Sequence, residues 1–186
     1  AALARVMLDL QARGCQNINF VTPSHVAPQI VAALLLAVPL GLNLPLVYNS
    51  SGYDALETLR ALDGIIDVYL PDLRYAAGDA AAKYSDAADY PAVARAAVRE
   101  MYRQVGNLKM DEDGVAVRGV IVRHLILPGG LSGSYQTLRF LAEEISPQIT
   151  LSVMSQYGPQ HRATAHPEIA RQLEQGEYAA VVEWLD

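Results

Sequence analysis

The sequence predicts an α/β fold, a partial (β/α) barrel of parallel strands. Three observations favour it. Strand-like and helix-like segments alternate about five times along the chain, the pattern of parallel βα units. The segment 65–70 is apolar almost throughout, as in strands covered on both faces. No Gly-x-Gly-x-x-Gly follows any strand, which disfavours a dinucleotide-binding fold. Five units are too few for a closed eight-stranded barrel.

The first half of the chain begins with an amphipathic helix, because Leu3, Val6, Met7 and Leu10 share one helical face. Gly14 ends that pattern. Alternation and β-branched content then predict strands at 17–22, 44–48 and 65–70, with helices at 27–38 and 54–62 between them. We expect Asp54 to begin the second of these helices by accepting hydrogen bonds from its free amide groups.

The second half begins with a long helical region, 78–105, which we expect to break near Tyr90-Pro91 because proline disfavours helical backbone in the preceding residue. The turn signal Asp111-Glu-Asp-Gly114 predicts a small hairpin before the next strand. Apolar patterning then predicts strands at 119–127 and 149–154, and helices at 135–145, 169–173 and 178–185.

The composition is that of one domain spanning residues 1–186, with 52% hydrophobic and 18% charged residues. A net charge of -6 disfavours nucleic-acid binding. Cys15 has no disulfide partner and no signal peptide is visible, so we expect a cytoplasmic protein. The uncharged span 26–47 is interrupted by proline and glycine, which argues against a membrane helix. Ala1 already lies within a helical pattern, so we expect further elements upstream.

Polar residues follow each predicted strand, where chemistry collects in parallel α/β folds. Thr22, Ser24 and Ser50 are also typical helix caps, and Asp72 with Arg74 is also typical of a local ion pair. Arg123-His124 is more unusual, because charged groups within an apolar strand need a polar cavity or a partner. The polar strand ends are Thr22 to His25, Asn49 to Tyr53, Pro71 to Tyr75, Pro128 to Gly133 and Ser155 to Pro159.

Other chemistries have little support. The four histidines have no i, i+4 spacing that would suggest a zinc site, so a metal site requires long-range assembly. A serine hydrolase is disfavoured because no Gly-x-Ser-x-Gly motif is present. The glycine-rich turn 129–133 lacks the lysine of a phosphate-binding loop.

Seven segments in order resemble the radical S-adenosylmethionine (SAM) proteins related to pyruvate formate-lyase activating enzyme. The likeness extends over nearly the whole chain. The segments are Asn17 to His25, Leu46 to Tyr53, Asp67 to Arg74, Lys83 to Ser85, Met101 to Gly106, Val122 to Gly129 and Met154 to Tyr157.

This resemblance implies a truncated radical SAM (β/α)6 core that lacks its first βα unit. Family members bind a [4Fe-4S] cluster through a Cys-x-x-x-Cys-x-x-Cys loop, which is absent here, so a cluster is expected only in the intact protein. Cys15 receives no cluster role. The resemblance assigns SAM contacts to Asn49, Ser51, Asp72, Arg74, Arg123 and His124, and also to Thr22, Ser24 and Gln156. Arg74 stands where related enzymes often have lysine, which changes the expected contact.

The resemblance implies that the intact protein cleaves SAM reductively to a 5′-deoxyadenosyl radical, while this chain alone is inactive. The radical would abstract hydrogen from a glycyl-radical enzyme or another substrate, with an electron donor such as flavodoxin as a further partner. Two alternatives remain open: a SAM- or nucleotide-binding module that works without a cluster, and a metal-dependent hydrolase.

Overall fold

The computed structural model describes residues 1–185. The strands are β1 (Ile18–Val21), β2 (Leu46–Ser50), β3 (Val68–Pro71), β4 (Lys109–Met110), β5 (Ala116–Leu125) and β6 (Thr150–Met154). The helices are α1 (Ala2–Ala12), α2 (Ala27–Ala37), α3 (Leu56–Ala61), α4 (Gly78–Ser85), α5 (Tyr90–Val105), α6 (Ser134–Phe140) and α7 (Gln175–Val182). Short 3-10 turns are η1 (Ser24–Val26), η2 (Val38–Leu40), η3 (Pro128–Gly130) and η5 (His161–Ala165), and η4 (Leu141–Ile145) is a π turn that extends α6.

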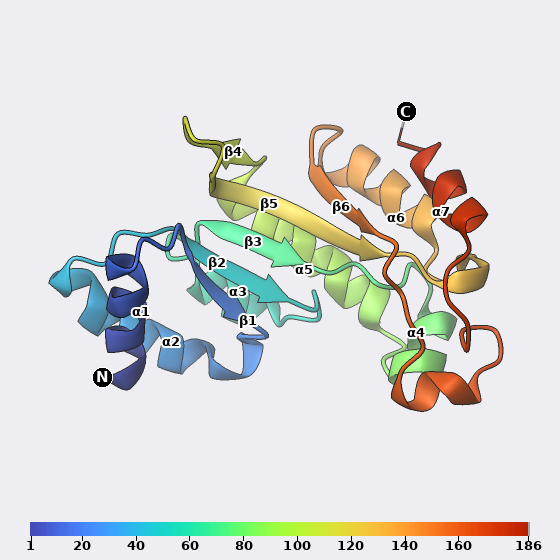
Figure 1. Cartoon of the computed structure of the whole chain (residues 1–186), viewed down its shortest axis with the longest axis horizontal. Helices are drawn as coiled ribbons and strands as arrows, with labels where there is room; N and C mark the ends of the chain where they lie inside the picture. The colour runs from blue at the N-terminus through green and yellow to red at the C-terminus, as the bar shows by residue number, and fades with distance from the viewer. Residues whose placement is uncertain (186) are drawn as a thin grey trace.

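The strands form one mostly parallel sheet of six strands, in the order β1-β2-β3-β5, with β4 and β6 both pairing with β5. Only β4 is antiparallel, and it forms the predicted hairpin with β5. Figure 1 shows β1, β2, β3, β5 and β6 side by side, with α3 and α5 behind them. The predicted α/β class with parallel strands is confirmed, whereas a barrel is not shown.

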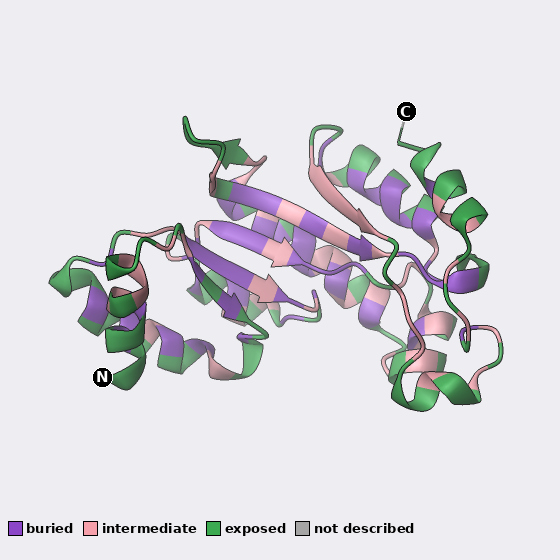
Figure 2. Ribbon diagram, viewed as in Figure 1, coloured by how far each residue is buried: buried purple, intermediate pink, exposed green. Residues whose placement is uncertain are grey.

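The main hydrophobic core lies between the sheet and the helices behind it. In α5 the buried residues Ala94, Ala97, Val98 and Met101 recur at helical spacing, so one face of the helix packs against the sheet. Tyr69 of β3 is fully buried there, and its hydroxyl donates to Gln104 Oε1 at 2.6 Å. Figure 2 shows the buried residues concentrated in the strands and along the helix faces turned toward them.

Three local predictions need correction. Asp54 does not begin α3, which starts two residues later and has no side-chain cap; the Asp54 carboxylate accepts three hydroxyl hydrogen bonds instead. The segment 169–173 forms turns and bends rather than a helix, because it lies in an irregular segment held by tertiary contacts. The break in the long helical region comes at 86–89, since Pro91 is favourable in the first turn of α5.

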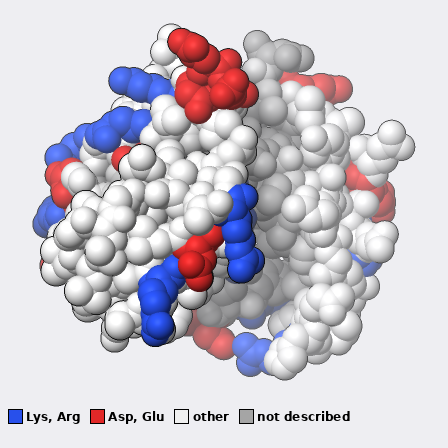
Figure 3. Space-filling model, turned by 60° about the vertical axis from the view of Figure 1, so that its left-hand side comes forward, with Lys and Arg blue, Asp and Glu red and all other residues white. Residues whose placement is uncertain are grey.

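On the face drawn in Figure 3, acidic and basic groups neighbour one another near the centre, a compact acidic group lies at the top, and much of the remaining surface is uncharged. Within residues 1–185, none of the helices combines the length and the apolar character needed to span a bilayer.

Candidate functional site

The register of the sheet brings several predicted residues to one face. Side chains alternate between the two faces of a strand, so residues two apart point the same way. Asp72 forms a parallel bridge with Arg123, and Arg123 pairs with Ser152 of β6. The face that carries Asp72 and Arg123 therefore also receives Arg74, Leu125 and Met154, each two residues beyond Asp72, Arg123 or Ser152, and Gln156, two residues beyond Met154.

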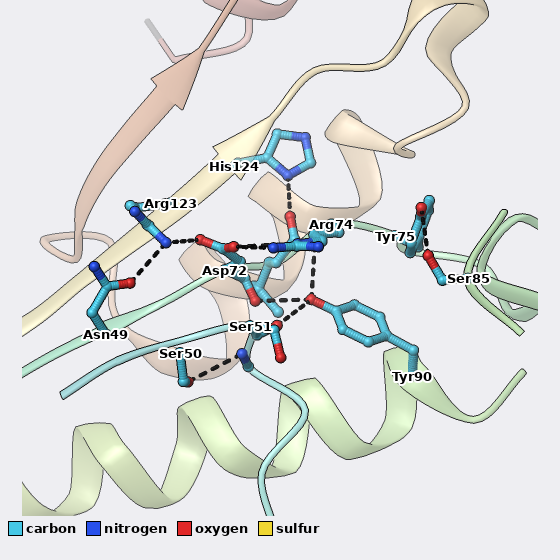
Figure 4. Close-up of polar contacts among 12 residues, drawn as sticks. Asn49, Ser50, Ser51, Asp72, Arg74, Tyr75, Ser85, Tyr90, Arg123 and His124 are labelled. Carbon is cyan, nitrogen blue, oxygen red and sulfur yellow. Dashed lines mark hydrogen bonds and ion pairs between the residues drawn. The ribbon is translucent and has the colours of Figure 1, made fainter. Parts of the chain in front are cut away.

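Asp72 is the centre of this site, because two arginines contact its carboxylate from opposite sides (Figure 4). Arg74 donates to Oδ2 through Nη2 at 2.8 Å and through Nε at 3.2 Å. Arg123 Nη2 lies 2.6 Å from Oδ1 and donates to Asn49 Oδ1 at 2.9 Å. Three consecutive strands of the parallel sheet are thus connected by one polar network at their carboxyl ends.

The network keeps a net positive charge, since two guanidinium groups share one carboxylate. The Asp72 side chain is only 9% exposed, compared with 28% for Arg123 and 50% for Arg74. Burial is the largest single influence on Arg74 and opposes its charged form, but the hydrogen bond and the charge attraction to Asp72 together outweigh it and raise the pKa of Arg74. Arg74 therefore remains cationic at any physiological pH.

Arg123 has unused hydrogen-bonding capacity. Its Nε is buried and has no hydrogen-bond partner among the described residues. Asp72 Oδ1 is satisfied by its ion pair with Arg123 Nη2 at 2.6 Å, so Nε is the group of this pair that has no partner. Because buried polar groups are normally satisfied, the free Nε–H group suggests that a ligand or water completes the site.

A pocket of about 430 Å³ opens beside these groups. That volume lies within the range of small-molecule sites. Its wall combines the charged network with apolar and amide side chains from the ends of β5 and β6: Asp72, Arg74, Tyr75, Arg123, Leu125, Leu127, Met154, Gln156 and Tyr157. The pocket can therefore hold a ligand that has both an anionic group and an uncharged surface.

Tyr90 supports the site from below and was not identified as a site residue from the sequence. Its hydroxyl lies 2.8 Å from Ser51 O and 2.9 Å from Asp72 O, and it accepts a hydrogen bond from Arg74 N at 3.1 Å (Figure 4). Burial raises the pKa of Tyr90, so the phenol keeps its proton. The sequence indicated only a helix break near this position. It could not show the role of Tyr90, because Tyr90 reaches the site through tertiary packing.

Gly52 allows the two loops to approach each other. Its φ is +76°, and a Cβ added there would lie 2.3 Å from Asp72 O. Only glycine fits both the backbone conformation and the space. The loop after β2 therefore lies directly against the loop after β3, at the point where Tyr90 joins them.

His124 lies on the opposite face of β5 from Arg123 and does not line the pocket. It is fully buried, with Nδ1 2.6 Å from Leu73 O and Nε2 2.8 Å from Ser134 Oγ. Since a carbonyl only accepts, Nδ1 carries the proton and Ser134 donates to Nε2. Burial lowers the pKa of His124, which keeps it neutral. The structure therefore gives His124 a partner within the core, one of the two outcomes expected from the sequence.

The remaining predicted residues fall in four places. Gln156 lines the pocket, whereas Ser51 contributes its carbonyl to the Tyr90 network. Thr22 N donates to Asn49 O at 2.8 Å, at the end of β1. Ser24 donates to Asp54 Oδ1 at 2.5 Å, in a cluster that also contains the hydroxyls of Tyr48 and Ser50. Neither Thr22 nor Ser24 lines the pocket.

The described residues do not fit an iron–sulfur cluster. Cys15 is the single cysteine, and no group of three or more His, Cys, Asp or Glu side chains in residues 1–185 is arranged to hold a metal ion. Three thiolates are needed for the cluster type that the resemblance implies. The arginine–aspartate network is suited instead to binding and orienting an organic ligand.

The chain has a distant curated relative. Uncharacterized protein MJ0674 of Methanocaldococcus jannaschii is 27% identical over 158 residues, which is 85% of this chain and 42% of that protein. The chain thus spans less than half of the length of this relative. No protein-family model matches the chain, and no solved structure matches it.

Proposed function

We propose that this chain forms the SAM-binding part of a radical SAM protein related to pyruvate formate-lyase activating enzyme. The intact protein would cleave SAM reductively to a 5′-deoxyadenosyl radical and use it to abstract hydrogen from a glycyl-radical enzyme or another substrate. The observation that carries the proposal is the convergence of Asn49, Asp72, Arg74 and Arg123 at the carboxyl ends of successive parallel strands.

The chemistry of these groups fits the parts of SAM. An arginine offers planar pairs of N–H donors that match a carboxylate, and Arg123 has a buried N–H group without a partner. Asp72 and Asn49 offer oxygen acceptors that suit ribose hydroxyls or an ammonium group. Leu125 and Met154 supply apolar surface for the rest of the ligand.

In this proposal, a segment outside the given chain binds the cluster, because residues 1–185 provide no set of three thiolates. The (β/α)6 barrel, with a further βα unit before β1, belongs to the same proposal. Its support is the strand order, in which each parallel strand of β1, β2, β3, β5 and β6 lies beside the next. The chain alone is expected to bind SAM weakly and to cleave none.

Nuclear magnetic resonance titration with SAM tests the site. Millimolar SAM should shift the side-chain amide of Asn49 and the Nε–H signals of Arg74 and Arg123. The variant Arg123→Gln should remove these shifts. The matched control Arg139→Gln should not, because Arg139 is an exposed cation of α6 that pairs with Glu143. Shifts elsewhere, or no shifts, would overturn the proposed site.

Two further outcomes separate the alternatives. Micromolar affinity of the chain alone for SAM would contradict the hypothesis that SAM binding depends on the cluster. It would favour a binding module that works without a cluster. Reconstitution with iron and sulfide should give no stoichiometric [4Fe-4S] spectrum. A stoichiometric spectrum would contradict the assignment of cluster binding to another segment.

A further inference from the structure

A second pocket, of about 320 Å³, adjoins the first. The two pockets share Tyr75, Leu127 and Tyr157 in their walls. The second lies between α4, the end of β5 and the irregular segment 157–169. Its volume is at the lower end of the range for small-molecule sites. A ligand held there would lie directly beside the Asp72–Arg123 network.

The wall of this second pocket is rich in hydrogen-bond donors. Lys83 and Arg162 are permanent cations, and the imidazoles of His161 and His166 have no hydrogen-bond partners among the described residues. No aspartate or glutamate in residues 1–185 lines the pocket. The chain as a whole is acidic, with a net charge of -6, so a pocket wall that has cations and no carboxylate differs from its average composition.

The carboxylates that pair with these cations lie outside the wall. Glu168 bonds to Lys83 and accepts from the Tyr84 hydroxyl at 2.7 Å. Its hydrogen bond from Lys83 lowers the pKa of Glu168 to about 2. Arg162 lies 3.0 Å from Asp86, but the two side chains are 70% and 76% exposed. Such an exposed pair is weak, so Arg162 can turn toward an anion at little cost.

Tyrosine rings supply the rest of the recognition surface. The Tyr157 hydroxyl is bonded to Ile169 O, and its ring forms part of the pocket wall. Tyr84 is held by a hydrogen bond to Glu168, and Lys83 Nζ lies 5.4 Å from its ring centroid. The Tyr75 ring stacks on the Tyr84 ring with 6.5 Å between the ring centroids. The His166 ring contacts Tyr84 edge-on, with 5.3 Å between the centroids. Aromatic walls of this kind favour a flat, apolar group.

We infer that this second pocket binds a small organic anion that carries a flat ring, with Arg162 and Lys83 contacting the anionic group. The binding site stands on its own contacts. Its role as the position of a substrate beside SAM rests on the proposed function. The anion can be a carboxylate or a phosphate ester, since both accept hydrogen bonds from guanidinium and ammonium groups.

The histidine ring signals test this inference on the whole chain. His161 and His166 line the pocket, whereas His25 and His124 lie outside it and serve as internal references. Phenyl phosphate or benzoate should shift the first two signals saturably and leave the others in place. Binding by phenyl phosphate alone would assign a phosphate ester, and binding by benzoate alone a carboxylate. Binding by both would assign the anionic group in general.

The variant Arg162→Gln should weaken the binding about fivefold, since a charge-assisted hydrogen bond is lost. Lys83→Gln should act in the same direction, and the control Arg139→Gln should have no effect. An unchanged His124 signal shows that each variant keeps its fold. The inference is overturned if neither anion binds, if neutral phenol binds equally well, or if inorganic phosphate matches phenyl phosphate. Undiminished binding in both pocket variants would also overturn it.

These outcomes are distinguishable from failure of the proposed function. Aryl anions can bind while SAM produces no shift at Asn49, in which case only the substrate role is lost. SAM can also bind beside Arg123 while His161 and His166 do not respond to any anion. The second result would leave the proposed function intact and remove this inference.

Discussion

Asp72 and Arg123 are joined through both backbone and side chain. The two residues form a parallel β-bridge, Leu73 N donates to Arg123 O at 2.8 Å, and Arg123 Nη2 lies 2.6 Å from Asp72 Oδ1. The ion pair at the site is therefore also part of the sheet that holds β3 and β5 together. Changes to the ligand-facing groups should affect both binding and stability.

Asp72→Asn should lower the free energy of unfolding by about 2 kcal/mol, because it leaves two arginines without their shared anion in a partly buried site. Urea denaturation measures the change. Asp86→Asn is the matched control, because its pair with Arg162 is exposed and should contribute less than about 0.5 kcal/mol. Equal effects of the two substitutions would contradict the central position of Asp72.

Tyr90→Phe should lower the free energy of unfolding by about 1–3 kcal/mol, since the carbonyls of Ser51 and Asp72 lose a buried donor. The Arg74 amide also loses its acceptor. Tyr53→Phe removes a hydroxyl of the same kind, bonded to Asp89 in an exposed position, and should have a small effect. A chemical denaturation series compares the two, and a silent Tyr90→Phe would refute the bridging role.

Gly52→Ala should be destabilising by more than about 2 kcal/mol, because the new methyl group would meet Asp72 O and the backbone would be strained. Gly41→Ala separates these causes. Gly41 also has a positive φ, of +98°, but nothing lies within 4 Å of its added Cβ. Gly41→Ala should lower the free energy of unfolding by about 1 kcal/mol, from backbone strain alone. Thermal unfolding of both variants checks the difference. Similar losses of stability in the two variants would exclude a clash at Gly52.

His124 should make the protein less stable as the pH falls. Burial lowers the pKa of His124 in the folded protein below its value in the unfolded chain, about 6.5. The unfolded chain therefore binds the extra proton first. The contribution of neutral His124 is complete above pH about 6.5 and is lost as the pH falls toward the lower folded pKa.

Urea denaturation at several pH values between about 6.5 and 5 measures this slope. His124→Gln should flatten it, although the variant is less stable at every pH because Leu73 O and Ser134 lose their partner. His25→Gln, at an exposed position, should leave the slope unchanged. A wild-type slope in His124→Gln would show that another group is responsible.

Much of the fold follows from local patterns. The alternation of helices and strands and the hairpin around β4 were predictable, because periodicity and turn residues act over a few neighbours. A break in the long helical region was also predicted, but it lies at 86–89 and not at Tyr90-Pro91. The segment 169–173 was predicted incorrectly as a helix. Its backbone is held instead by contacts such as the Tyr157 hydroxyl, which donates to Ile169 O.

The candidate site was only partly predictable. A parallel strand presents its polar residues at its carboxyl end, which gave a broad set of candidates from position alone. The family resemblance then selected residues from that set, including Asn49, Asp72, Arg74, Arg123 and Gln156. The sequence could not show which of Arg123 and His124 faces the pocket. The pleat of β5 does so, since it turns one side chain to the pocket and the other to the core.

The sequence by itself determined the class of the fold and the order of its elements, because these depend on residues close together in the chain. Only the tertiary structure decided the neighbours of Asp72, the support from Tyr90 and the role of Asp54. It also brought α4 beside segment 157–169 to form the second pocket. These contacts join residues far apart in sequence, and their geometry depends on register, packing and burial that local propensity does not encode.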